Sequence, residues 1–285
     1  MVKVIVLGKN GMLGSAFFSA FEKDNRFDIT GYDRSDFDMT NFDRLGEVIL
    51  DSSADFVINC VGYTAVDQCE SDEDEAFLLN CDLCAKLAEF CNEAGSTLIH
   101  FSTDYVFDGE NSNGYEEDAL VDPINIYGES KLAGERLVVQ NAGSHVIVRT
   151  SWLFGKCGKN FVDTIIGLAK TRKEIKVVDD QIGSPTYTAD LAKAIFKLAE
   201  ITMAKPVKDI YHISNNGKVS WYEYTRRILE YAHIADVKVT PITSEELDRP
   251  AKRPKMSALN NSRYQKTTHD KMRDYNEALQ EYLIK

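Results

Sequence analysis

The sequence predicts an α/β fold in which a doubly wound parallel sheet is followed by a smaller C-terminal lobe. Short runs rich in Val and Ile alternate with longer amphipathic segments, which is typical of parallel strands with helices on both faces of the sheet. A glycine-rich turn follows the first of these runs. The chain has 285 residues, 44% of them hydrophobic, so it is long enough to bury a large core.

The alternation is most regular in the first half of the chain. The apolar run at 2–7 is rich in β-branched residues and precedes an amphipathic segment at 12–21, so a buried strand and a helix are expected there. The same reasoning predicts further strands and helices up to residue 150. The strands are expected at 28–33, 56–60, 97–101 and 146–150, and the helices near 43–52, 75–94 and 125–140.

Beyond residue 150 the alternation loosens, and from Ser214 onward polar and aromatic residues become more frequent. We therefore assign residues 1–150 to the main sheet domain and 151–285 mainly to the smaller lobe, with elements near 184–215 returning to the main domain. The elements that still fit the α/β scheme are a helix near 160–170, a strand near 175–178, a helix near 188–200 and a strand at 209–213.

The charge balance restricts the partners. Lys and Arg number 33 against 45 Asp and Glu, and this net charge of −12 makes nucleic acid and anionic membranes unfavourable partners. No stretch approaches the roughly 20 apolar residues that span a bilayer, and the N-terminal segment lacks the features of a secretion signal. We therefore expect a cytoplasmic protein that binds neither nucleic acid nor membrane.

The six cysteines raise the question of a metal or redox site. Cys81 and Cys84 have the CxxC spacing of half a zinc site or of a redox pair. However, Cys84, Leu87 and Cys91 fall on one stripe of an expected helix, and no second CxxC or spaced His pair completes a zinc shell. The pattern favours buried structural thiols.

Three glycines, Gly8, Gly11 and Gly14, lie between the first strand and the first helix with GxxGxxG spacing. In a Rossmann-type domain such a turn lets the backbone approach a pyrophosphate and lets the helix pack closely on the strand. The N-terminus of the helix adds free N–H groups for the phosphates. We therefore expect residues 1–150 to bind NADH or NADPH. The expected contacts in this turn are Gly8, Asn10, Gly11, Met12, Leu13 and Gly14.

The residues after the second expected strand are candidates for the adenosine end of the cofactor. Asp33 lies 19 positions past Gly14, where a carboxylate accepts hydrogen bonds from a ribose 2′-OH, and this favours NADH. Arg34 is able to pair with a 2′-phosphate, so NADPH is the alternative. Asp38 and Met39 are expected to cover the adenine. For the acidic residues, the competing interpretation is a solvated loop.

Tyr127 and Lys131 form a YxxxK motif on an expected helix, where the i, i+4 spacing places both side chains on one face. A neighbouring cation stabilises a phenolate and brings the pKa of Tyr toward neutral pH. Thr103 follows an expected strand, at the edge where such sheets place their ligands, and is able to hydrogen-bond a substrate oxygen. YxxxK by itself is common in helices. Together, the three residues indicate hydride transfer to a carbonyl, with Tyr127 as general acid.

Longer motifs carry a more specific signal. Besides the glycine turn, they are NCVGYTAVDQCE (59–70), STDYVFDG (102–109), INIYGESKLAGE (124–135), RTSWLFG (149–155), VVDDQIGSPT (177–186) and RPAKRPKMSALN (249–260). Through these segments the chain resembles the dTDP-4-dehydrorhamnose reductases, a family of extended short-chain dehydrogenase/reductases, over nearly its whole length.

The resemblance implies a set of site residues. It makes Thr103, Tyr127 and Lys131 the catalytic residues, with the last two also touching the cofactor. The resemblance places Cys60, Gly62, Tyr63 and Thr64 beside the nicotinamide half of the cofactor, and Val66, Thr103, Asp104, Tyr105 and Trp152 against a deoxysugar nucleotide in a substrate-binding lobe. For Trp152, a role in the hydrophobic core is an equal alternative to this contact with the substrate.

A basic segment near the C-terminus is a candidate for binding the diphosphate. Arg249, Lys252, Arg253 and Lys255 put four positive charges into seven residues of an acidic protein. We expect Arg249 and Arg253 to contact the substrate, with a solvated basic turn as the alternative. Some members of the family carry a Glu two positions after the third glycine for a metal-bridged dimer, whereas this chain has Ala16. We therefore expect no metal, and a monomer or a homodimer.

The expected function is the NAD(P)H-dependent reduction of the C4 ketone of dTDP-4-dehydrorhamnose, that is dTDP-4-dehydro-6-deoxy-L-mannose, to dTDP-L-rhamnose. One alternative is another nucleotide-sugar reductase or epimerase of the same fold. A second is a non-catalytic NADP-binding regulatory subunit, since the family resembles the regulatory subunit of methionine adenosyltransferase. The presence of Thr103, Tyr127 and Lys131 together argues against the second alternative, because a binding module needs no proton donor.

Overall fold

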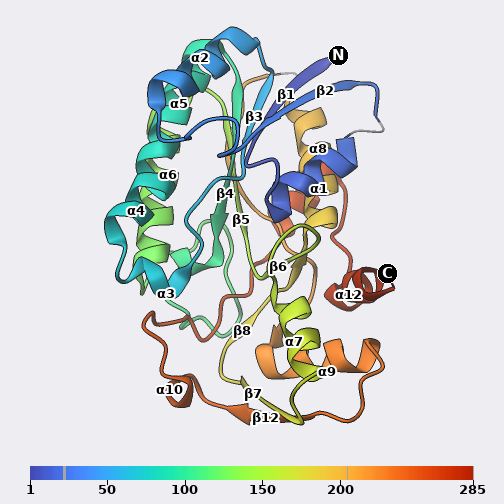
Figure 1. Ribbon diagram of the computed structural model, residues 1–285. Coiled ribbons are helices and arrows are strands. Elements are labelled where there is room, and N and C mark those ends of the chain that lie inside the picture. The colour runs from blue at the N-terminus through green and yellow to red at the C-terminus, as the bar shows by residue number, and fades with distance from the viewer. Residues whose placement is uncertain (22–23, 204, 285) are drawn as a thin grey trace.

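The computed structural model describes residues 1–21, 24–203 and 205–284, and a parallel sheet of six strands forms its centre (Figure 1). All its strand pairs are parallel, in the order β2-β1-β3-β4-β5-β10. This confirms the predicted fold class. The strands are β1 (Val2–Leu7), β2 (Phe27–Tyr32), β3 (Phe56–Asn59), β4 (Thr97–Thr103), β5 (His145–Thr150) and β10 (Lys208–His212).

The order of the strands determines where a ligand site forms. From β1 the chain moves to β2 on one side, and then returns to β3 on the other side and continues outward. In such sheets the connections that leave adjacent strands in opposite directions open a crevice at the carboxyl ends. Here that crevice lies between the ends of β1 and β3.

Helices cover both faces of the sheet, as the alternating pattern predicts (Figure 1). Phe17 and Leu191 belong to the apolar core on one face, and Leu45 and Leu87 to the core on the other. Burial on both faces explains why the strands read as continuous apolar runs. One face carries α1 (Met12–Phe21) and α8 (Thr188–Thr202), and the other carries α2 (Phe42–Ser52), α5 (Leu83–Ala94) and α6 (Ile126–Asn141).

The helix predicted near 75–94 is interrupted by a π-helical turn. The segment divides into α4 (Glu73–Phe77), η1 (Leu78–Asp82) and α5, and Asn80 lies in the middle of η1. The Asn80 side chain is fully buried and bonds the backbone N–H and C=O of Tyr63, at 2.9 and 3.0 Å, and the Ser130 hydroxyl, at 3.0 Å. π-Helical turns are frequent at functional sites. Through the Asn80 side chain, this π-helical turn forms hydrogen bonds with both the loop after β3 and α6.

The lower lobe in Figure 1 has its own aromatic core, which includes Phe154, Tyr187 and Tyr224. The strand expected near 175–178 is β7 (Glu174–Val178), but it pairs with β12 (Lys238–Ile242) in a separate sheet instead of joining the main one. The exact domain boundary stays a prediction. The other lobe elements are α7 (Phe161–Ala169), α9 (Trp221–Tyr231), α10 (Ser244–Leu247) and α12 (Tyr275–Leu283).

Short elements connect the two parts. Two pairs of two-residue strands lie beyond β5, and short helical turns follow β3 and β4. The pairs are β6 (Leu153–Phe154) with β9 (Thr186–Tyr187) and β8 (Ile182–Gly183) with β11 (Val219–Ser220), and the turns are α3 (Val66–Cys69) and η2 (Asp104–Val106). A further short helix, α11 (Ser262–Thr268), lies near the C-terminus.

None of the described helices is long and apolar enough to cross a membrane.

Candidate active site

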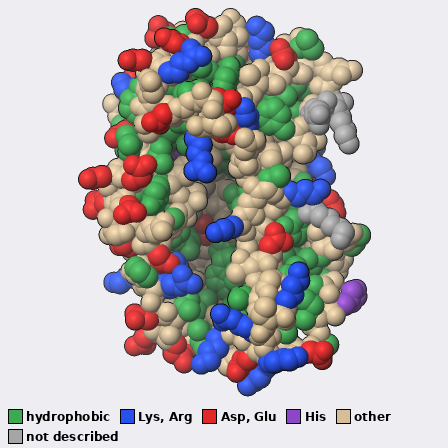
Figure 2. Space-filling view, viewed as in Figure 1, with side chains coloured by type: hydrophobic (Ala, Val, Ile, Leu, Met, Phe, Trp, Pro, Cys, Tyr) green, Lys and Arg blue, Asp and Glu red, His purple; other side chains and the backbone are tan. Residues whose placement is uncertain are grey.

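A cavity of about 490 Å³ lies at the carboxyl ends of the central strands. Figure 2 shows a hollow in the middle of the molecule with Lys or Arg side chains beside it, while Asp and Glu side chains gather along the outer edge over α2 and α4. The cavity is where the strand order predicts a ligand site. Of the expected site residues it brings together Gly11, Met12, Leu13, Cys60, Gly62, Thr64, Val66, Thr103, Asp104, Tyr105, Tyr127, Lys131 and Trp152.

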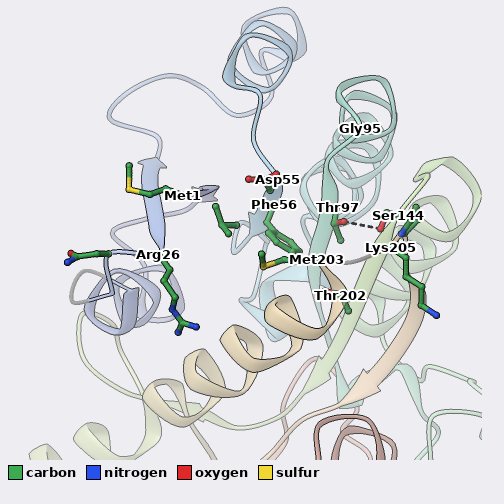
Figure 3. A pocket seen from close by; sticks show the side chains of 13 residues that line it. Met1, Arg26, Asp55, Phe56, Gly95, Thr97, Ser144, Thr202, Met203 and Lys205 are labelled. Carbon is green, nitrogen blue, oxygen red and sulfur yellow. Dashed lines mark hydrogen bonds between the residues drawn. The ribbon is translucent and has the colours of Figure 1, made fainter.

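A larger hollow, of about 810 Å³, lies at the opposite, amino-terminal edge of the sheet (Figure 3). Several of its polar side chains already have partners within the protein. Thr97 and Ser144 share a hydrogen bond of 2.9 Å, and Arg26 pairs with Asp24 and Glu200. Because all the strands point away from this hollow, we place the function in the smaller cavity.

The glycine turn is shaped to receive a dinucleotide. Gly8 has φ of +85°, and the Gly11 N–H donates to its carbonyl oxygen at 3.0 Å. A Cβ at Gly14 would collide with the same oxygen, so only glycine allows α1 to approach the turn this closely. The first turn of α1 carries no acidic side chain. Its free N–H groups therefore fit the pyrophosphate of NAD(P)H.

Replacing Gly14 by Ala is expected to raise the Kd for NADPH by about tenfold or more, since the added methyl group pushes the turn away from α1. Fluorescence titration with NADPH measures this. Gly167→Ala is the matched control, because Gly167 lies exposed on α7 with open space around it. An unchanged Kd in Gly14→Ala would contradict the role given to this turn.

At the adenosine end, Asp33 is buried and its carboxylate accepts hydrogen bonds from Asn10 and from the Ser35 backbone and hydroxyl, at 2.7 and 2.6 Å. The Ser35 hydroxyl is the main cause of the lowered pKa of Asp33, so the carboxylate is ionised beside the glycine turn. Arg34 is exposed and forms no ion pair within the described part of the chain.

The two residues expected to cover the adenine differ in exposure. Asp38 is exposed, and its carboxylate accepts hydrogen bonds from the backbone N–H and the hydroxyl of Thr40 at 2.9 and 2.8 Å. Met39 is only 5% exposed and belongs to the core beneath the sheet, together with Leu7. Its side chain therefore offers little surface to an adenine, and the contact stays a prediction.

Thr103 and Tyr127 meet at the floor of the cavity. Thr103 ends β4, accepts the N–H of Tyr105 at 3.2 Å and donates to the Asp104 carboxylate at 3.0 Å. Tyr127 lies in the first turn of α6, which Asn125 caps by accepting the Gly128 N–H at 2.8 Å. Burial raises the pKa of Tyr127, and a hydrogen bond with Thr103 lowers it by less. Tyr127 is therefore protonated at neutral pH, as a general acid must be.

Lys131 is buried one helical turn further on and donates to the carbonyl oxygen of Phe101 at 2.6 Å. Burial lowers the pKa of Lys131, while Cys84 and Glu135 raise it. The sequence led us to expect that Lys131 lowers the pKa of Tyr127. In this structure Lys131 is not among the groups that shift the pKa of Tyr127, because its ammonium group is directed to a backbone carbonyl instead.

Three polar atoms in the wall of the cavity are buried without a hydrogen-bond partner: Ser102 Oγ, Asp104 Oδ2 and Thr150 Oγ1. Buried polar atoms are nearly always paired, so unpaired ones on residues that line a cavity are candidates for contact with a polar ligand. Ser102 and Thr150 were not singled out from the sequence. The signal was present, because Thr150 is the last residue of β5 and Ser102 the last but one of β4, and the carboxyl ends of these strands form this edge.

Asp104 combines this position with an unusual pKa. Burial raises the pKa of the carboxyl to about 7, while hydrogen bonds from Ser257 and Thr103 lower it by less. A native pKa above the ordinary value of 3.8 means that the folded protein binds the proton more tightly than the unfolded chain. Stability from this group is therefore complete below about pH 4 and is lost as the pH rises to about 7.

Asp104→Asn is expected to raise the melting temperature at pH 8 more than at pH 5, because it removes a buried carboxylate that costs on the order of 4 kcal/mol when ionised. Thermal unfolding at the two pH values, followed by circular dichroism, measures this. Asp28→Asn, on the exposed side of β2, is the control. Equal gains for Asp104→Asn at both pH values would contradict the assignment.

An aromatic wall closes the side of the cavity that faces the lobe. Trp152 stacks on Trp221 with ring centroids 3.4 Å apart and an interplanar angle of 5°. Trp152 has φ of +47°, a strained conformation for a bulky residue, which proteins keep mainly at functional sites. Gly183 leaves room for its ring. Trp221 was missed from the sequence because it enters from α9, far along the chain.

Tyr63 does not reach the cavity. Its hydroxyl donates to Asp72 at 2.8 Å, away from Tyr127, and its backbone is held by Asn80. Its neighbours in the loop, Cys60, Gly62 and Thr64, do line the cavity. The contact of Tyr63 with the nicotinamide half of the cofactor stays a prediction, and its backbone is the part that would make this contact. Other lining residues not expected from the sequence are Asn59, Val61, Phe101, Ser151 and Leu153.

The basic segment 249–255 lines a second cavity, of about 390 Å³, near the first. Arg249 and Arg253 pair with Asp67 at 3.0 and 2.7 Å. Burial raises the pKa of Tyr105, which lines the first cavity, and the charge of Arg253 opposes this rise only in part. The two arginines therefore stand beside the catalytic cavity and not within it. Their contact with substrate stays a prediction.

The cysteines are free thiols, and four of the six are buried. Cys84 lies 3.8 Å from His100 Nδ1 in the core beneath Lys131. Within residues 1–21, 24–203 and 205–284, no group of three His, Cys, Asp or Glu side chains is arranged to hold a metal ion.

The sheet, the glycine turn and the Tyr127–Lys131 pair define a reductase of the short-chain dehydrogenase class. The family model "RmlD substrate binding domain" matches residues 2–285. The chain is 36% identical to dTDP-4-dehydrorhamnose reductase of Aggregatibacter actinomycetemcomitans, over 98% of this chain and 97% of that one. It is 37% identical to the spore coat polysaccharide biosynthesis protein SpsK of Bacillus subtilis, over 99% and 97%.

A solved structure agrees with these relatives. The dTDP-4-dehydrorhamnose reductase of Bacillus anthracis, in complex with NADP, superposes with a TM-score of 0.93 at 40% identity, covering 100% of this chain and 99% of that one. The chain therefore belongs to the dTDP-4-dehydrorhamnose reductase family.

Proposed function

We propose that this protein uses NADPH or NADH to reduce the C4 ketone of dTDP-4-dehydrorhamnose to dTDP-L-rhamnose. The observation that carries this is the position of a protonated Tyr127, hydrogen-bonded to Thr103, between the glycine turn and a wall with unpaired polar atoms. Membership of the reductase family and the NADP complex of a relative support the choice of cofactor and substrate.

The bound cofactor would supply a hydride to the ketone carbon. The glycine turn and the N-terminus of α1 would hold its pyrophosphate. Thr103 would orient the ketone oxygen, and Tyr127 would give its phenolic proton to that oxygen as charge develops there. Lys131, now bound to the Phe101 carbonyl, has further N–H groups for a ribose hydroxyl.

The rest of the cavity would select the sugar nucleotide. Trp152 and Trp221 offer a flat apolar face, which suits a base or a sugar ring. Asp104 and Thr150 offer unpaired oxygen atoms to hydroxyl groups. An ordinary aldehyde reductase would have no need of such a wall, so we expect nucleotide sugars to be preferred over small carbonyl compounds.

The experiment is to follow NADPH and NADH oxidation by the purified protein with dTDP-4-dehydrorhamnose generated in situ, and to identify the sugar product. Rapid oxidation that yields dTDP-L-rhamnose supports the proposal and ranks the two cofactors. Another 6-deoxysugar as product would move the assignment to a different nucleotide-sugar reductase. Bound cofactor without net oxidation would point to an epimerase or a binding subunit.

A further inference from the structure

Asp67, in α3, is a charged residue that the proposed mechanism does not use, and it lies between the two cavities. Its neighbour Val66 lines the catalytic cavity, whereas the residues that Asp67 contacts line the second one. The carboxylate receives Arg249 at 3.0 Å, Arg253 at 2.7 Å and the N–H of Ala251 at 3.3 Å. A single carboxylate thus forms ion pairs with both arginines of the basic segment.

The basic segment is held at a second point as well. The Asn125 side chain donates to the Lys252 carbonyl at 2.7 Å while its oxygen caps α6, the helix of Tyr127. Asp67 and Asn125 therefore attach the segment to the sheet domain at two points, one in α3 and one at the N-terminus of α6. This anchoring joins residues that are 186 and 127 positions apart in the chain.

Most donors of the two arginines remain free. Each uses its Nη1 for Asp67, and Arg253 Nη1 also donates to the Ala251 carbonyl at 2.6 Å. Among the described residues, no acceptor is bound to the other guanidinium nitrogens, and Lys252 and Lys255 have no ion-pair partner. A guanidinium that is held through one of its nitrogens and has no acceptor at the other two is well prepared for a multidentate anion.

We propose that Asp67 is a positioning residue which holds Arg249 and Arg253 ready for the diphosphate of the nucleotide sugar. The proposal rests on the function proposed above. Asp67 itself does not touch the substrate. Its carboxylate fixes two flexible, highly charged side chains before the ligand arrives, so that their ordering does not oppose binding. Burial disfavours the ionised carboxylate, but Arg253 and Arg249 outweigh it and keep the pKa of Asp67 low.

The test compares Asp67→Ala and Asp67→Asn with the wild type in binding of dTDP, the nucleotide part of the substrate, by isothermal titration calorimetry. We expect Asp67→Ala to raise the Kd for dTDP about tenfold, which corresponds to about 1.4 kcal/mol. Asp67→Asn, which keeps one acceptor oxygen, should lie in between. The KM for the dTDP-sugar should rise in parallel, whereas kcat and the Kd for NADPH should change less than twofold.

Asp74→Asn is the matched control, since Asp74 is an exposed acid on the neighbouring α4 without a side-chain partner in the described structure. It should leave the Kd for dTDP unchanged, which excludes a general effect of net charge. A merely structural role of Asp67 would lower the melting temperature and kcat without a selective rise in the Kd for dTDP, and would overturn the proposal. Asp67→Glu, which keeps the carboxylate, is expected to bind dTDP more tightly than Asp67→Ala does.

The outcomes separate the two proposals. If the wild type binds dTDP and reduces the sugar but the Asp67 variants bind dTDP as well as the wild type, or more tightly, the role of Asp67 is overturned and the proposed function stands. If the wild type neither binds dTDP nor reduces the sugar, the proposed function fails, and the role of Asp67 toward a nucleotide diphosphate fails with it.

Discussion

Tyr127→Phe lowers kcat by about 10²- to 10⁴-fold, the range typical of a positioned general acid, while NADPH still binds. The variant keeps the ring, so its edge contact with Tyr105, at a centroid distance of 5.7 Å, is retained. Only the proton donor and the hydrogen bond with Thr103 are lost. Steady-state rates with the dTDP-sugar and a separate titration with NADPH measure the two effects.

Tyr63→Phe is the matched control for this prediction. It removes the same hydroxyl from a tyrosine of the adjacent loop, but that hydroxyl donates to Asp72 outside the cavity. We expect kcat to remain within about twofold of the wild type, because this hydroxyl is remote from the reacting atoms. If Tyr127→Phe retained full activity, Tyr127 would not be the acid.

Arg149→Met is expected to destabilise the fold by about 3–5 kcal/mol, because it leaves Glu135 as a buried charge without its partner. Arg149 and Glu135 form a two-point ion pair at 2.9 and 2.7 Å, and their side chains are 4% and 3% exposed. Arg149 also lies over the ring of Phe107, 5.2 Å from its centroid. The pair joins β5 to α6, the helix that carries Tyr127 and Lys131. Urea unfolding measures the loss.

Two further variants make this result specific. Arg44→Met breaks an exposed ion pair with Glu47, in which the side chains are 54% and 61% exposed, and should cost less than about 1 kcal/mol. Adding Glu135→Leu to Arg149→Met should restore part of the stability, since removing both charges avoids the unpaired one. A loss below about 1 kcal/mol in Arg149→Met would show that water reaches Glu135.

The strands and the glycine turn were predictable because their signals are local. A strand buried on both faces reads as a continuous apolar run, and each of the main strands lies within one or two residues of its expected bounds. The turn is equally local, since Gly8 and Gly14 are required by contacts within a few residues of each other. Tyr127 and Lys131 lie on a helix and Thr103 lies at the end of a strand, as the local pattern predicted.

The π-helical turn at Asn80 and the pairing of β7 with β12 were not predictable in this way. An inserted residue in a helix changes the apolar periodicity very little, and the partner of a short strand depends on which distant strand reaches it. Trp221 is a similar case, since it becomes part of the site only when α9 brings its ring onto Trp152.

By itself the sequence determined the fold class and the family, and it supplied the predictions of a dinucleotide-binding turn and of Thr103, Tyr127 and Lys131 as catalytic residues. Each of these depends on residues that are close in the chain or on motifs long enough to be specific. Only the tertiary structure decided that the Tyr63 hydroxyl is bound to Asp72, that Lys131 is bound to the Phe101 carbonyl, and that Asp67 pairs with two arginines far along the chain. The physical reason is that side-chain direction, burial and ion pairing depend on what the rest of the chain places around a residue.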